Sequence, residues 1–248
     1  MPELPEVETI VRGLRPSLEG QTITAVDIRR EDMLVFEPGL DLQDLRGARI
    51  QGVHRRGKLI LMALAAQRGE RFLATHLKMT GQLHLPEGTS IAPDRHTHLI
   101  FRLGSGALLT YRDPRRFGGC RLHTPEGLQE WSFLSTLGPE PLEIDAKTFC
   151  GLFTRRSGTI KGLLLNQKVI AGIGNIYADE SLFRAGIRPG AKANTLSQAR
   201  LCKLHATIQE VLSEAIAACG SSIRDYRDAE GNAGAFQNAF RVYGRGGQ

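Results

Sequence analysis

The N-terminal segment Met1-Pro2-Glu3-Leu4-Pro5-Glu6 contains residues that could form and use an amine nucleophile. Removal of the initiator methionine before a residue as small as proline would leave a secondary amine at Pro2. An α-amino group has a pKa of about 7.7–8.0, so roughly a tenth or more of it is unprotonated at neutral pH. A neutral amine can attack a carbonyl or sugar carbon to form an iminium, and Glu3 could move the proton. The alternative is a simple helix entry, which is the commoner role of such a segment when it is taken alone.

The most basic segment of the chain is Arg112–Gly119. Arg115, Arg116 and Phe117 would lie in a turn after a strand, where arginines can contact phosphates and an aromatic ring can insert between bases. Met79 could supply a second apolar wedge if the chain folds it beside this turn. The alternative is that these residues are solvated charges at strand ends, which is the commoner outcome for such runs.

Gly172 and Gly174 precede a helical pattern that begins at Asn175. Glycines at this place let backbone N–H groups approach an anion, which the helix dipole also attracts. A dinucleotide-binding fingerprint would need a third glycine where Tyr177 stands, and a preceding βαβ unit. A DNA phosphate is therefore the predicted anion.

The charge balance is consistent with a polyanionic partner. The chain has 32 basic and 26 acidic residues, a net charge of +6, and 25 of the basic residues are arginines. The planar guanidinium matches phosphate oxygens in pairs. A GC-rich genome would raise the arginine content without such a partner, so charge alone leaves both explanations open. The segment Arg55-Arg56-Gly57-Lys58 is similarly ambiguous, as a basic loop or as the carrier of a phosphate-facing Lys58.

Length and composition exclude several classes of protein. The chain has 248 residues, of which 41% are apolar, so it can bury a sizeable core in one large domain or two smaller ones. No apolar run approaches the roughly 18 residues of a membrane span. Three glutamates among the first eight residues replace the basic and apolar stretches of a signal peptide. We expect a cytoplasmic protein that does not enter a membrane.

The four cysteines stand at positions 120, 150, 202 and 219, and none belongs to a Cys-x-x-Cys pair. Paired cysteines at such short spacing are typical of structural zinc sites. We therefore expect the four to be small buried apolar residues, with no metal ligand among them.

Hydrophobic periodicity predicts a chain that is first β and then α. A helix is expected over residues 5–18, followed by strands over 22–28, 58–64, 71–77, 98–103 and 107–112, which suggest an antiparallel sandwich or barrel. The segment Leu137–Leu142 carries two prolines and a glycine and is predicted to be a linker.

Two helices are predicted beyond this linker. One starts at Asn175 and ends near Gly186, and the other is capped by Ser197 and ends at Gly220. From about residue 228, alternating apolar residues in a glycine-rich stretch favour a strand or hairpin.

Together these segments resemble the formamidopyrimidine-DNA glycosylases, bacterial repair enzymes for oxidised purines. The resemblance extends over essentially the whole chain. Its motifs are Pro2–Thr9, Arg56–Lys58, His76–Gly81, Asp113–Gly118, Leu137–Pro141, Gly172–Tyr177 and Val242–Arg245. The related endonuclease VIII branch has Pro-Glu-Gly-Pro-Glu where this chain has Pro-Glu-Leu-Pro-Glu.

The resemblance implies a role for each matching residue. Pro2 would be the nucleophile at C1′ of the damaged nucleotide, Glu3 the acid and proton shuttle, and Lys58 the catalytic lysine near the lesion phosphate. Residues that would intercalate or contact the DNA backbone are Met79, His96, Arg115, Arg116, Phe117, Lys161 and Asn175. Residues that would line the lesion pocket or cap the base are Glu6, Tyr177, Glu180 and Arg224.

The resemblance also implies two domains and a zinc site. We expect a catalytic β-sandwich domain over 1–134, a linker over 135–142, a helix–two-turn–helix domain over 143–228, and the start of a C-terminal hairpin over 229–248. In the family a four-cysteine zinc finger follows the Tyr-Gly-Arg motif, and this sequence ends at Gln248 before it. Zinc is therefore expected only if the natural chain continues.

The implied function is base-excision repair of oxidised purines in double-stranded DNA by a monomer. A glycosylase for oxidised pyrimidines shares the same chemistry and is the first alternative. A DNA-binding protein without catalysis is the second, although binding alone would not require Pro2, Glu3 and Lys58 together.

Overall fold

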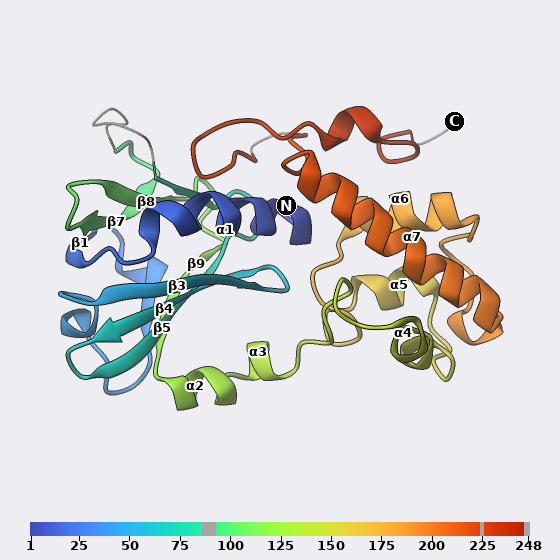
Figure 1. Cartoon of the computed structure of the whole chain (residues 1–248), viewed down its shortest axis with the longest axis horizontal. Coiled ribbons are helices and arrows are strands. Elements are labelled where there is room, and N and C mark those ends of the chain that lie inside the picture. The colour runs from blue at the N-terminus through green and yellow to red at the C-terminus, as the bar shows by residue number, and fades with distance from the viewer. Residues whose placement is uncertain (86–92, 224–225, 246–248) are drawn as a thin grey trace.

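The computed structural model describes residues 1–85, 93–223 and 226–245, and the chain folds into two lobes that lie side by side (Figure 1). The N-terminus lies where the lobes meet. The first lobe contains the β-sheets and the second contains the long helices, so the predicted α+β architecture with two domains is confirmed. Within the described residues, no helix combines the length and apolarity that a membrane span requires.

The first lobe is a sandwich of two sheets. One sheet has the strand order β1-β7-β8-β6 and the other has the order β2-β9-β5-β4-β3. Neighbouring strands are antiparallel except for the β2–β9 pair, which is parallel. The strands are β1 (Ile23–Ile28), β2 (Leu34–Phe36), β3 (Arg49–Arg56), β4 (Leu59–Ala66), β5 (Gly69–His76), β6 (Gln82–His84), β7 (Thr97–Leu103), β8 (Leu108–Arg112) and β9 (Gly119–His123).

Four of these strands were not predicted from the sequence, namely β2, β3, β6 and β9. In β3 the only large apolar side chains are those of Ile50 and Val53, which enter the core on either side of a register shift, while arginines and a histidine occupy much of the rest of the strand. This mixture conceals the strand from a search for apolar runs. The β2 and β6 strands are only three residues long.

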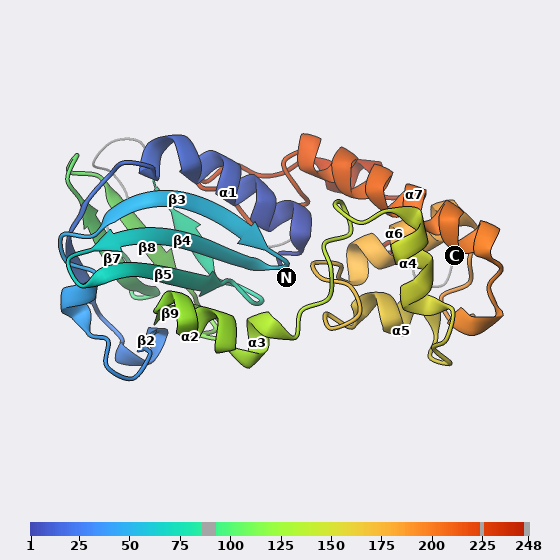
Figure 2. The same cartoon turned by 60° about the horizontal axis from the view of Figure 1, so that its bottom comes forward.

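Helix α1 (Leu4–Leu18) connects the N-terminus to the sandwich and lies beside β3 (Figure 2). Its apolar face is fully buried in the core of the first lobe. The helix begins with a reciprocal capping box, in which the Glu3 backbone N–H donates to the carboxylate of Glu6 at 2.8 Å. Two residues of the catalytic motif are therefore also the residues that start the helix.

The second lobe is built from α4 (Ala146–Phe153), α5 (Ile160–Leu165), α6 (Asn175–Ala185) and α7 (Gln198–Ala217). Ser197 caps α7 and Gly186 ends α6 in a left-handed conformation, as the sequence predicts. The face of α7 that includes Leu201, Leu204 and Ile208 is buried against the other helices. Two short helices, α2 (Pro125–Glu130) and α3 (Ser132–Ser135), precede the segment that joins the lobes (Figure 2).

The chain after α7 contradicts the predicted strand or hairpin. Within residues 228–245 the structure contains only a short 3₁₀ helix, η4 (Phe236–Ala239). The backbone N–H groups of 241–243 donate to the carboxylate of Glu180 instead of to another strand. The apolar residues of this segment serve packing, because Phe236 enters the core of the second lobe while Ala229 enters that of the first.

The expectation for the cysteines was correct for two of the four. Cys120 and Cys150 are buried, Cys202 is half-buried, and Cys219 is exposed. The Sγ atoms of Cys150 on α4 and Cys202 on α7 are 3.4 Å apart. Cys219 is exposed because it stands in the tight turn after α7 in a left-handed conformation, with φ of 57°.

Candidate active site

A cavity of about 450 Å³ lies between the two lobes and contains Pro2 in its wall. Its lining comes from α1, from two loops of the sandwich, from the start of α6 and from the segment after α7. The lining residues are Met1, Pro2, Glu6, Met79, Thr80, Arg115, Ile176, Ser221, Ile223, Tyr226 and Tyr243. The fold therefore brings the N-terminus together with the two candidate wedge segments, which are far apart in the sequence.

The carboxylate of Glu3 occupies the N-terminal end of α6. It accepts hydrogen bonds from the backbone N–H groups of Gly174 at 2.8 Å, Ile176 at 3.1 Å and Tyr177 at 3.5 Å. The glycine loop therefore binds an anion, as the sequence predicts, and in the free protein that anion is the chain's own carboxylate. The contact of Asn175 with a DNA phosphate stays a prediction.

Glycine at 174 is required by this contact. A Cβ at that position would fall on the carboxyl group of Glu3. Gly172 has φ of 84°, and a Cβ there would meet the side chain of Leu4 at 2.7 Å. The backbone of Gly172 also accepts from the N–H of Leu4 at 3.0 Å. The loop is therefore fitted closely to the start of α1.

Burial dominates the electrostatics of Glu3. The side chain is 3% exposed, and desolvation raises the pKa of its carboxyl group from 4.5 to about 7, against the opposing effect of Lys58. Burial also lowers the pKa of Lys58, while Glu3 and Glu6 oppose this shift. A carboxyl group that titrates near neutral pH can donate and accept protons under the conditions of the cell.

The turn before Lys58 is held by Glu140, which belongs to the segment predicted only as a linker. The Glu140 carboxylate accepts from the Gly57 N–H at 2.6 Å, from Arg55 at 2.6 Å and from Arg56 at 2.9 Å. Arg55 and Arg56 therefore serve this ion pair in the free protein, and the position of Lys58 depends on the junction between the lobes.

Glu6 joins three parts of the cavity wall. Its Oε1 accepts from the Tyr177 hydroxyl on α6, and from the Ser221 N–H at 2.8 Å and hydroxyl at 3.0 Å. The other oxygen accepts from the Glu3 N–H. The predicted location of Glu6 in the pocket wall agrees with this geometry, and Tyr177 lies behind it as a donor.

The wedge side chains project from two loops that share one organising residue, Asp113. The buried carboxylate of Asp113 accepts from the hydroxyl of Thr80 in the first loop, and from the N–H groups of Arg115 at 3.2 Å and Gly118 at 2.9 Å in the second. Met79 is 42% exposed and Phe117 is 54% exposed, although both are large apolar residues. Exposure of this kind is typical of a binding surface.

The arginines of the second loop also point outward. The Arg115 guanidinium lies over the ring of Phe117, 4.5 Å from its centroid. Arg116 is exposed and has φ of 56°, so the loop holds a strained conformation at its tip. This geometry is suited to contacts with a second molecule.

Three other predicted residues do not line the cavity. His96 is half-buried on the turn before β7, Asn175 is exposed at the start of α6, and Lys161 forms an ion pair with Asp179 at 2.8 Å. Arg224 lies outside the described residues.

The structure does not place Glu180 in the cavity wall. It is completely buried and accepts hydrogen bonds from the backbone of residues 241–243, so it holds the C-terminal segment in place.

Three residues of this site received no role from the sequence. Asp113 could have been found because Asp before Pro is typical of a turn in which the side chain caps the following N–H groups. Glu140 and Ser221 carry no local signal, because their partners lie 83–85 and 215 residues away.

The zinc ion that the resemblance implies finds no ligands in the part of the chain that the structure describes. No group of three or more His, Cys, Asp or Glu side chains there could hold a metal ion. The described residues therefore do not fit a zinc site.

An interlobe cavity with the N-terminus and a buried carboxylate in its wall and with exposed wedge side chains at its edge is typical of base-excision DNA glycosylases. Two family models match the chain, the formamidopyrimidine-DNA glycosylase N-terminal domain over residues 1–120 and the formamidopyrimidine-DNA glycosylase H2TH domain over residues 137–227. The chain belongs to the formamidopyrimidine-DNA glycosylase family.

Relatives and solved structures of this family resemble the chain along its length. The formamidopyrimidine-DNA glycosylases of Nitratidesulfovibrio vulgaris and Roseobacter denitrificans are 41% and 43% identical, over 100% of this chain and 93% and 89% of theirs. The MutM (Fpg) structure from Thermus thermophilus superposes with a TM-score of 0.86 at 39% identity, over 98% of this chain and 88% of that one. A Lactococcus lactis Fpg complex with abasic-site DNA gives 0.86 at 34% identity, with the same coverage.

Proposed function

We propose that this chain removes oxidised purines, 8-oxoguanine and formamidopyrimidines, from duplex DNA and then cleaves the strand at the abasic site. The observation that carries this proposal is the cavity in which Pro2 and Glu6 face the wedge residues Met79 and Arg115. Relatives named as formamidopyrimidine-DNA glycosylases, and structures of Lactococcus lactis Fpg with Fapy-dG and abasic-site DNA, support the purine substrate.

The chemistry begins with the amine of Pro2 after removal of Met1. Its nitrogen attacks C1′ of the damaged nucleotide, the C1′–N bond to the base breaks, and the base leaves with a proton. Glu3 supplies a proton to the sugar ring oxygen, and ring opening gives an iminium between Pro2 and C1′. The raised pKa of Glu3 keeps about half of its carboxyl groups protonated near pH 7.

Strand cleavage follows because the iminium acidifies C2′. Removal of a C2′ proton breaks the C3′–O bond, which releases the 3′ phosphate, and a second elimination breaks the C5′–O bond. Lys58 provides a partly desolvated cation for the lesion phosphate. Water finally hydrolyses the iminium and restores the amine.

Access to the lesion requires that the nucleotide leave the duplex, at a cost of a few kcal/mol. Met79, Arg115 and Phe117 would fill the vacated space and offset the lost stacking. His96, Arg116, Lys161 and Asn175 would contact phosphates. The protein would act as a monomer in the cytoplasm.

Reductive trapping tests the proposal. Borohydride should cross-link the protein to duplex DNA that contains 8-oxoguanine, because it reduces the iminium to a stable amine. Pro2→Gly should trap more slowly, since its amine is primary and less constrained, and a chain with one extra residue before Pro2 should not trap at all. A cross-link formed by the extended chain would refute the role of Pro2.

Excision, binding and trapping on duplexes with different lesions separate the two alternative functions. Faster excision from a duplex with an oxidised pyrimidine than from one with 8-oxoguanine would identify a glycosylase for oxidised pyrimidines. Binding to damaged DNA without excision or trapping would identify a non-catalytic protein.

A further inference from the structure

A second cavity, of about 240 Å³, lies on the other side of the wedge loops. We call it the outer pocket and define it by its lining residues, Asp32, Val35, Ala74, His76, Lys78, Phe117, Gly118, Gly119, Cys120, Arg121, Trp131 and Phe133. It opens where the strands β2, β5 and β9 meet the start of α3. Phe117, one of its lining residues, belongs to the wedge, and the pocket itself has no role in the site described above.

The floor of the outer pocket is a row of aromatic rings. Trp131 and Phe133 stack with their centroids 5.1 Å apart and an angle of 25° between the planes. His123 stacks on the other face of Trp131 at 4.9 Å, and His76 meets Phe133 edge-on at 5.7 Å. The rings support one another, so the platform is preorganised.

Two cations stand over this platform. The Lys78 ammonium is 5.6 Å from the centroid of Phe133, and the Arg121 guanidinium is 5.6 Å from that of Trp131. The one lining carboxylate, Asp32, forms an exposed ion pair with Arg30 at 3.2 Å. Aromatic rings flanked by cations are the arrangement by which proteins bind single nucleotides of a nucleic-acid strand without reading their sequence.

The outer pocket and the active-site cavity share the wedge loops as a partition. Met79 and Arg115 line the active-site cavity, whereas Lys78 and Phe117 line the outer pocket. The contact between Arg115 and the ring of Phe117 connects the two sides. If the damaged nucleotide enters the cavity of Pro2, a nucleotide that reaches the outer pocket must come from the other side of the wedge.

We propose that the outer pocket binds a nucleobase of the undamaged strand beside the lesion, in contact with Trp131 and Phe133, with its phosphate near Lys78 and Arg121. This inference rests on the proposed function, because it needs a DNA duplex opened by the wedge. The pocket would hold the undamaged strand while the damaged strand is processed.

Trp131 is the only tryptophan of the chain, so its fluorescence reports on the outer pocket directly. The whole protein is titrated with a duplex that carries one tetrahydrofuran abasic analogue opposite cytosine. A second duplex has the same damaged strand. In its undamaged strand, tetrahydrofuran replaces the nucleoside opposite the lesion and the nucleosides on either side of it, so that these three bases are absent. Anisotropy of a dye on the DNA measures binding independently.

The first duplex should quench Trp131 with the same midpoint as the anisotropy curve, and the second should bind without comparable quenching. Binding of the first duplex without quenching, or equal quenching by both, would overturn the inference but leave the proposed function intact. Failure to bind either duplex, together with failure to trap, would instead refute the proposed function.

Variants provide a second test. Arg121→Gln and Phe133→Leu should each weaken binding of the first duplex by at least about fivefold. This factor is the lower end of the range for the loss of one contact between a base and the protein. Phe133→Tyr keeps the ring and should retain binding. Arg102→Gln, an exposed arginine on β7 in the other sheet, is the matched control for charge. Trapping on a single-stranded abasic oligonucleotide should be unchanged in all four, and wild-type affinity of both Arg121→Gln and Phe133→Leu would refute the inference.

Discussion

The backbone N–H of Gly174 donates a 2.8 Å hydrogen bond to the carboxylate of Glu3, across 171 residues of sequence and between the two lobes. The candidate catalytic acid thus belongs to the first lobe by its covalent chain, and its donors belong to the second. The N-terminus of α6, which elsewhere in proteins binds phosphates, here fixes a side chain of the protein itself.

The raised pKa of Glu3 predicts how stability depends on pH. Because the folded state holds this proton more tightly than the unfolded state, the contribution of Glu3 is fully present below pH 4.5 and is lost as the pH rises through about 7. The loss is on the order of 3 kcal/mol in the free energy of unfolding. Glu3→Gln should remove this dependence. Urea unfolding of the wild type and of Glu3→Gln between pH 5 and 8 measures the free energy of unfolding at each pH. If this free energy changed with pH in the same way in both proteins, Glu3 would not be the titrating group.

The close contact at Gly174 predicts a large effect from a single methyl group. Gly174→Ala would place its Cβ on the Glu3 carboxyl group although the backbone conformation suits alanine, with φ of −127°. We expect a loss of about 1–3 kcal/mol in unfolding free energy and a strong loss of excision. Gly151→Ala is the control, because a Cβ there meets nothing within 4 Å on helix α4, and it should stabilise by up to about 1 kcal/mol. Equal effects of the two changes would show that the fit of the loop is unimportant.

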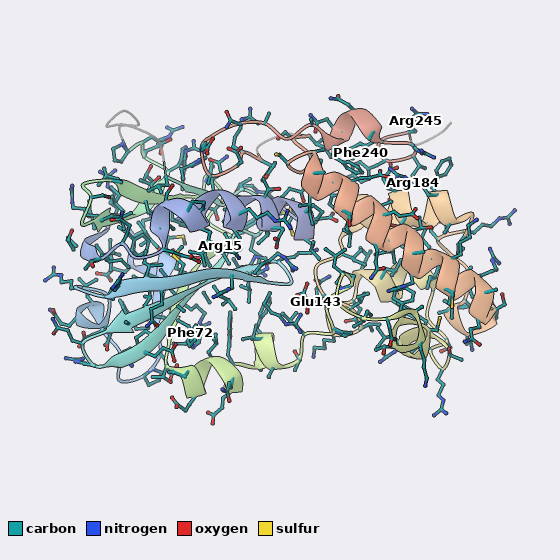
Figure 3. All side chains as sticks on the ribbon, in the orientation of Figure 1. Arg15, Phe72, Glu143, Arg184, Phe240 and Arg245 are labelled. Atoms are coloured by element: carbon teal, nitrogen blue, oxygen red, sulfur yellow. The ribbon has the colours of Figure 1, made fainter. Side chains whose placement is uncertain are left out.

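Glu140 is predicted to position Lys58 from a distance. Glu140→Gln leaves Arg55 and Arg56 without their shared carboxylate, which should cost about 3 kcal/mol of stability and slow excision. Glu143→Gln is the control, since Glu143 is exposed and follows three residues after Glu140, near the place where the lobes join (Figure 3). Thermal unfolding and single-turnover excision check both variants. Unchanged excision by a folded Glu140→Gln protein would exclude the positioning role.

The wedge residues should matter more for extrusion than for the later steps. Met79→Ala and Phe117→Ala should slow excision of 8-oxoguanine about tenfold or more, since a few kcal/mol of unstacking must be offset. Cleavage at a preformed abasic site should change much less. Single-turnover rates on the two substrates make the comparison, and equal losses on both would mean that these side chains act in packing or chemistry.

Asp179 shares the positive charge of Lys161 with any phosphate that this lysine binds. Asp179→Asn should therefore tighten DNA binding by about two- to fivefold, the equivalent of one partly exposed ion pair. Lys161→Ala should make the slope of log Kd against log salt shallower by about 0.9. Fluorescence anisotropy at several salt concentrations measures both. No change of slope in Lys161→Ala would remove this residue from the DNA interface.

Local signals in the sequence predicted the elements but not their partners. The capping residue Ser197, the C-cap Gly186 and the apolar face of α7 determine helices by short-range contacts, so periodicity was sufficient to find them. The glycines at 172 and 174 likewise predicted an anion site. Which anion enters it depends on the fold as a whole, and no spacing rule relates Glu3 to Gly174.

The residues of the candidate site also differ in how far the sequence could predict them. The resemblance identified Pro2, Glu3 and Glu6, which the structure brings together beside the cavity, and their roles stay predictions. Glu180 shows the limit, because a buried carboxylate that binds backbone N–H groups and one that faces a ligand have the same sequence signature. The arrangement of the C-terminal segment decides between them.

The shared hydrogen bonds of Glu3 and Glu6 also restrict how members of this family can be recombined. A chimera that takes the sandwich from one relative and the helices from another must keep the geometry of these contacts, because each acid comes from the start of α1 and its donors come from the second half of the chain. The two lobes are distinct in shape, but the catalytic site that we propose is divided between them.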